Sequence, residues 1–145
     1  MPGFDGDPVF CSLVKSCDDF GFFGIELVEC ERIEQHYLAN TAILLTRLFD
    51  RFGGSIEVTD FAPRSRQFGR TFRPMMLIRR LRRLPGNPRL LLRLRPACAE
   101  GAMRPEVTQG SHHIRYVAPT LTLRLTTDVS LIARPLRQRW AGFCS

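Results

Sequence analysis

The chain has 145 residues, an apolar fraction of 44% and a formal net charge of +7. This length predicts one domain able to bury a core, and the composition excludes a wholly disordered chain. No apolar run approaches the roughly 18–20 residues that span a bilayer, and the chain does not open on a charged segment followed by an apolar one, so we expect a cytoplasmic protein without membrane contact.

Alternating and β-branched runs separated by glycine and proline predict a succession of strands with little helix. The opening of the chain is irregular, with one short helical turn expected over 10–15. Strands are predicted, in chain order, over 22–28, 32–38, 41–49, 55–61, 75–84, 89–95, 113–117 and 120–126. Short antiparallel strands joined by tight turns predict an all-β protein, an antiparallel β-sandwich.

The middle of the chain carries the clearest hairpin signal. The runs 41–49 and 55–61 flank a Gly-Gly turn, which is typical of a β-hairpin. In the second run Ile56 and Val58 alternate with Glu57, which predicts one buried face and one solvated face.

Charge is distributed unevenly along the chain. Residues 1–60 contain eleven acidic and four basic side chains, whereas residues 61–145 contain three acidic side chains and seventeen arginines. The arginines between Arg79 and Arg95 flank one turn and would form a basic hairpin able to contact nucleic-acid phosphates. Few aromatic residues are interleaved with them, so we disfavour stacking on single strands and expect a solvated face or one that docks an acidic domain.

No metal site or cofactor is predicted. The five cysteines form no Cys-x-x-Cys pair and are expected to be free thiols. Asp5 and Asp7 lack the later oxygen ligands of a calcium loop. His112 and His113 are adjacent, so on a strand they would point to opposite faces and could not chelate one ion together.

A series of short motifs occurs in a fixed order over most of the chain. These are Phe4-Asp5-Gly6-Asp7-Pro8, Gln35-His36-Tyr37-Leu38-Ala39-Asn40, Asp60-Phe61-Ala62-Pro63-Arg64, Arg70-Thr71-Phe72-Arg73-Pro74, Gly86-Asn87-Pro88-Arg89, Arg95-Pro96-Ala97, Gly110-Ser111-His112-His113 and Leu125-Thr126-Thr127-Asp128. Together they resemble the N-terminal, trehalase-like β-domain that precedes the catalytic barrel in bacterial glycoside hydrolases of family 15.

The resemblance implies a supersandwich-like domain that is incomplete, truncated at both ends. Residues 1–132 would form the partial domain, and the basic stretch 133–145 would lie outside the fold. Inverting hydrolysis requires two carboxylates about 6.5–9.5 Å apart, and in this family both are glutamates of the helical barrel. We therefore expect no catalytic residue in this chain. Its partner would be that barrel, and an α-glucoside such as trehalose or an α-glucan would be met only through the parent enzyme.

The resemblance also implies a contact between domains. The segment 62–73 is predicted to be a loop because of its prolines and glycine. It carries the family's Arg-x-Phe-Arg-Pro pattern. The residues expected to contact the barrel, or carbonyls within the sandwich, in preference to a sugar, are Arg64, Arg70, Phe72 and Arg73. The acidic cluster Glu26, Glu29, Glu31 and Glu34 is expected to be a solvated face rather than a catalytic pair.

Overall fold

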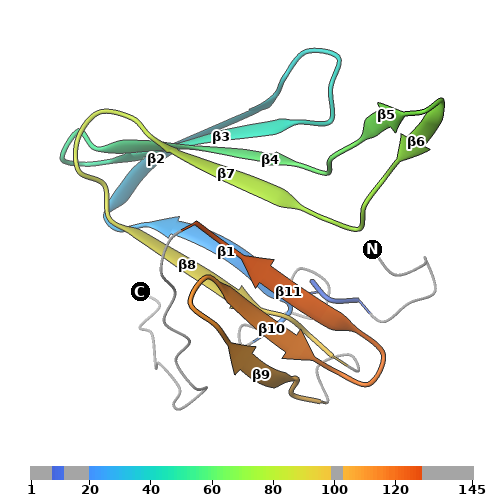
Figure 1. Ribbon diagram of the computed structural model, residues 1–145. Helices are drawn as coiled ribbons and strands as arrows, with labels where there is room; N and C mark the ends of the chain where they lie inside the picture. Colours follow the sequence, from blue (N-terminus) through green and yellow to red (C-terminus); the bar gives the residue numbers. More distant parts are fainter. Residues whose placement is uncertain (1–7, 12–19, 99–102, 129–145) are drawn as a thin grey trace. The chain divides into compact units, whose positions relative to one another are not determined.

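A computed structural model describes residues 8–11, 20–98 and 103–128, and in these ranges the chain contains strands and no helix (Figure 1). The all-β, antiparallel prediction is therefore confirmed. The strands are β1 (Phe22–Leu27), β2 (Cys30–Tyr37), β3 (Leu44–Asp50), β4 (Ser55–Phe61), β5 (Ser65–Gln67), β6 (Arg70–Phe72), β7 (Ile78–Arg83), β8 (Leu90–Arg95), β9 (Glu106–Gln109), β10 (His113–Val117) and β11 (Thr122–Thr126).

The described residues divide into two compact units. The first spans 23–94, and the second combines 8–11 and 20–22 with 95–98 and 103–128. A single sandwich over residues 1–132 stays a prediction. The basic stretch 133–145 and most of the expected helical turn over 10–15 lie outside the described residues.

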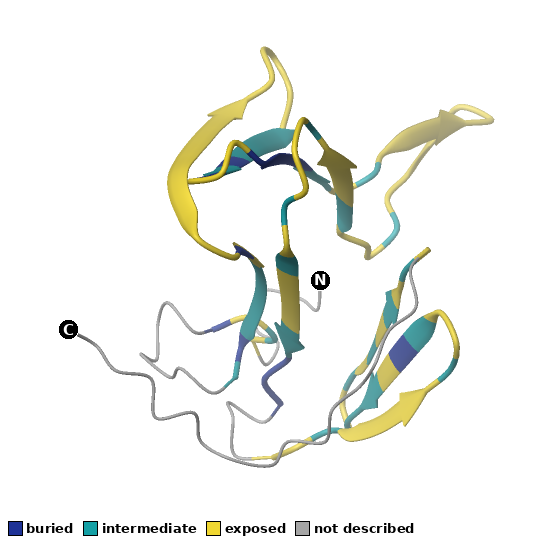
Figure 2. Cartoon of the chain, turned by 90° about the vertical axis from the view of Figure 1, so that its left-hand side faces the viewer, coloured by how far each residue is buried: buried dark blue, intermediate teal, exposed yellow. Residues whose placement is uncertain are grey.

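The first unit is built on an antiparallel sheet with the strand order β2-β3-β4-β7, beside the two-stranded ribbon β1-β8. Its core is formed where one face of the sheet meets the ribbon. The buried residues of this core are Leu27, Leu48, Ile56 and Val58, with Ile25 and Leu90 packed against them. The buried residues lie toward the end of β3 and in the first half of β4, whereas β2 is exposed along its whole length (Figure 2).

The predicted hairpin is confirmed as β3–β4, but its solvated face is not as expected. Glu57 is only 5% exposed. It lies on a central strand, directly opposite Arg47 of β3 and Arg82 of β7. Both guanidinium groups bond its carboxylate, at 3.0 Å from Arg47 and 2.7 Å from Arg82. Long cross-strand neighbours therefore cover a residue that alternation alone placed in water.

Two further expectations are corrected. The segment predicted as a loop contains the hairpin β5–β6, because its prolines and glycine lie at the ends and the turn rather than within the strands. The arginine-rich strands β7 and β8 do not form one hairpin. Strand β7 pairs with β4, and β8 pairs with β1, so the expected basic ribbon is divided between two sheets.

The second unit contains the sheet β9-β10-β11, in which β10 pairs antiparallel with both neighbours. Its buried residues include Cys11, Ala97, Cys98 and Ile114. Backbone hydrogen bonds from Gly21 to Arg95 and from Ala97 to Val9 connect the N-terminal segments with the later ones.

Candidate docking arm

The segment 62–77 leaves the end of β4, forms the hairpin β5–β6 and returns to β7; we call it the arm (Figure 1). It contains four basic residues and no acidic one. The basic residues are Arg64, Arg66, Arg70 and Arg73. The structure brings all four predicted contact residues into this one element, with Ser65 opposite Phe72 and Gln67 opposite Arg70.

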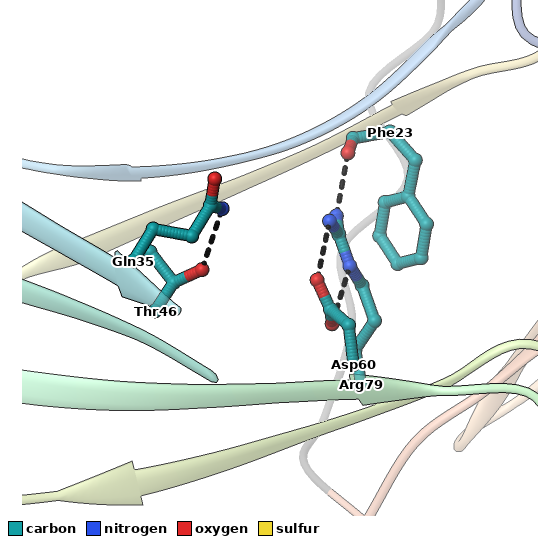
Figure 3. A network of polar contacts seen from close by, with 5 residues as sticks. All are labelled: Phe23, Gln35, Thr46, Asp60 and Arg79. Carbon is teal, nitrogen blue, oxygen red and sulfur yellow. Dashed lines mark hydrogen bonds and ion pairs between the residues drawn. The ribbon is translucent and has the colours of Figure 1, made fainter. Parts of the chain in front are cut away.

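A clamp holds the base of the arm. Arg79, near the start of β7, donates to both carboxylate oxygens of Asp60 at 2.9 and 3.0 Å, near the end of β4 (Figure 3). Its remaining guanidinium nitrogen donates to the carbonyl of Phe23 at 2.5 Å, and the guanidinium lies 4.5 Å from the centre of the Phe23 ring. A bidentate, partly buried ion pair is geometrically specific, so the arm leaves the sheet from a fixed point.

The tip of the arm has an unusual backbone. Phe68 has a φ of 50° and Gly69 a φ of 73°. Two consecutive positive φ angles are typical of a type I′ turn, which prefers Asn-Gly. A phenylalanine in the left-handed region costs roughly 1–2 kcal/mol. Because the Phe68 side chain is 96% exposed, burial does not offset this cost within the described chain.

Other apolar side chains of the arm are also uncovered. Phe72 is 59% exposed and Met75 77% exposed, and Met76 and Leu77 are exposed as well. Several adjacent apolar residues left in solvent are typical of an interaction surface. Within the described ranges, the side chains of the four arm arginines have no hydrogen bond or ion pair. The arm therefore combines uncompensated positive charge with apolar contact area.

Sequence reasoning missed Phe68. The signal was present, because Gly69 lies between two short polar stretches and a single glycine there is the commonest mark of a tight turn. Treating the whole segment as a loop hid the turn, and with it the residue at the tip.

Of the thirteen arginines outside the arm in the described ranges, seven contact an acidic or aromatic side chain. Arg82 pairs with Glu57, and Arg93 pairs with Glu26 at 2.8 Å. The guanidinium of Arg95 lies 5.9 Å from the centre of the Phe22 ring. Together with the separation of β7 from β8, these contacts reduce the positive charge available to a nucleic acid.

The acidic cluster is likewise engaged by arginines. Besides the Glu26 pair, Glu29 pairs with Arg51, and Glu34 pairs with Arg32 at 2.8 Å. Three of the four glutamates in the cluster are thus in solvent-exposed ion pairs.

Among residues 8–11, 20–98 and 103–128, no three His, Cys, Asp or Glu side chains are placed to hold a metal ion. His113 packs against the turn, because a Cβ atom at Gly110 would meet its ring. Asp5 and Asp7 lie outside the described residues. The described part of the chain has no helix long and apolar enough to cross a membrane.

Comparison with known proteins gives no match to any family model, to any curated protein or to any solved structure.

Proposed function

We propose that this chain is a non-catalytic β-domain that docks onto a partner protein through the arm. The observation that carries the proposal is Phe68, a bulky side chain held in a costly backbone conformation and 96% exposed. Strain at a residue that gains nothing from the fold is a basis for inferring function, since a partner that buries the ring would offset the cost.

The chemistry of the arm defines the partner surface. Four arginines without an acid on the same segment favour a carboxylate-rich surface, which arginine can bind with paired hydrogen bonds. Phe68, Phe72 and Met75 favour apolar pockets within that surface. Aromatic and arginine side chains are the residues that most often dominate binding energy at protein interfaces.

The motif resemblance suggests which protein the partner is. In a family 15-like glycoside hydrolase the β-domain supports a helical barrel that hydrolyses α-glucosidic bonds, as in trehalose or α-glucans. Under this proposal the present chain supplies the support and the barrel supplies both catalytic glutamates. Supporting observations are the two-layer β architecture of residues 23–94 and the engagement of Glu26, Glu29 and Glu34 by arginines. The isolated chain is then expected to leave trehalose and maltose unhydrolysed.

Calorimetric titration tests the docking. The full chain is titrated with a family 15 catalytic barrel prepared without its own β-domain. We expect saturable binding that Phe68→Asn weakens about tenfold, equivalent to about 1.4 kcal/mol. Because asparagine is favoured at this turn position, the variant removes the ring without straining the hairpin.

Phe52→Ala is the matched control, since Phe52 is 77% exposed in a different turn and should leave the affinity unchanged. Absence of binding, or equal weakening by both substitutions, contradicts the proposal. Saturable, salt-sensitive binding of duplex DNA or RNA that depends on the arm arginines would instead support the nucleic-acid alternative.

A further inference from the structure

The four-stranded sheet of residues 23–94 ends in two unpaired strands. Strand β2 forms one edge and β7 the other, and within the described ranges neither has a second neighbour. All eight residues of β2 are exposed. A long, uncovered edge offers a row of backbone donors and acceptors to another strand.

A row of alternating charge crosses this sheet. Cross-strand register places Glu34 of β2 opposite Arg47 of β3, then Glu57 of β4, then Arg82 of β7. The row thus begins with an acid at one free edge and ends with a base at the other. Opposite charges on directly facing residues stabilise neighbouring strands, whereas like charges destabilise them.

Strand direction allows the row to continue into a second molecule. Each pair in the sheet is antiparallel, so β2 runs opposite to β7. A second copy in the same orientation would therefore place its β2 antiparallel to β7 of the first, with Glu34 opposite Arg82. This register also sets Gln35 opposite Leu81. A shift by two residues would set Glu34 opposite Arg80 but would also set Arg32 opposite Arg82, and this like-charge pair disfavours the shifted register.

We propose that the chain associates with further copies of itself by pairing the β2 edge of one copy with the β7 edge of the next. The two edges differ, so the contact is heterologous. Each assembly therefore keeps one unpaired β2 edge and one unpaired β7 edge. Growth is then open, giving a concentration-dependent series of oligomers rather than a closed dimer. The arm takes no part in this contact, so the proposal is independent of docking onto a barrel.

Sedimentation velocity of the full chain over a concentration series tests this pairing. We expect a weight-average sedimentation coefficient that rises without reaching a plateau and falls when salt is added. Glu34→Arg should weaken association at least about tenfold, because repulsion replaces attraction. Glu31→Arg makes the same change of charge on the same strand, but its position lies beyond the end of β7 in this register, so association should persist.

Further measurements separate pairing from misfolding. Circular dichroism verifies that each variant retains its strands. If Glu34→Arg does not fold, Glu34→Gln removes the attraction alone and should weaken association about two- to fivefold. Phe68→Asn should leave association unchanged, which distinguishes edge pairing from docking through the arm. A chain that stays monomeric, a plateau at the dimer, or equal effects at positions 31 and 34 would overturn the proposal.

Discussion

Glu57 shows how neighbours decide the state of a single residue. Burial by itself raises the pKa of Glu57, but the hydrogen bond from Arg47 and the positive charge of Arg82 outweigh it and hold the pKa below its ordinary value of 4.5. A carboxyl with a lowered pKa in the folded state stabilises the fold at pH values above the ordinary pKa. This contribution is lost as the pH falls through the folded-state pKa.

We therefore expect Glu57→Gln to lower the free energy of unfolding at neutral pH by about 2–3 kcal/mol, because two arginines lose their shared charged partner. The deficit should shrink in acid, where the native glutamate is itself protonated. Urea unfolding over a pH series measures both effects. Glu31→Gln, on the exposed strand β2, should change stability by at most about 0.5 kcal/mol at any pH. A deficit that does not vary with pH would contradict this assignment.

Arg79 makes contacts that lysine cannot reproduce. Its guanidinium bonds both oxygens of Asp60 and the Phe23 carbonyl. Arg79→Lys keeps the charge but loses the paired geometry, so we expect a loss of about 1–2 kcal/mol in urea unfolding. Arg80→Lys, at an exposed neighbour, is the control and should be nearly neutral. Equal losses of stability at the two positions would show that the contacts of Arg79 with Asp60 and Phe23 contribute only through charge.

At the scale of elements, two turns differ in why they require a glycine. A Cβ atom at Gly86 would lie 2.5 Å from Gly54 Cα, whereas at Gly53 it would meet nothing within 4 Å. Both glycines have positive φ angles, 88° and 81°. Gly53→Ala should cost only the backbone strain, about 1–2 kcal/mol, and Gly86→Ala should cost more because backbone must also move. Thermal unfolding of the two variants measures the difference, and equal losses would show that the close approach is unimportant.

Strand positions were predictable where apolar alternation or a turn signal marked them, as in β3, β4, β8 and β10. Strand β9 was missed because its four residues are all exposed and show no alternation. Strand partners were harder to predict. The tight turn after β7 indicated a β7–β8 hairpin, but the Asp60–Arg79 and Glu57–Arg82 pairs join β7 to β4, and Leu90 places β8 in the core. Such pairings depend on contacts distant in sequence.

The candidate site was predicted in part for the same reason. Arg64, Arg70, Phe72 and Arg73 are recognisable as a local motif; Arg70 and Phe72 lie on β6, and Arg64 and Arg73 flank the β5–β6 hairpin. The exposure and backbone strain of Phe68 are properties of the folded turn. They could not be predicted from the residue types in this segment.

At the scale of the whole molecule, we propose a division of labour between a supporting β-domain and a partner that performs the chemistry. Hydrogen exchange of the full chain, with and without a family 15 barrel that lacks its β-domain, tests this most directly. If the arm docks onto the barrel, we expect slower exchange in β5, β6 and residues 75–77, and little change in β2 or β10. Protection confined to other strands, or no protection at barrel concentrations that saturate binding, would contradict it.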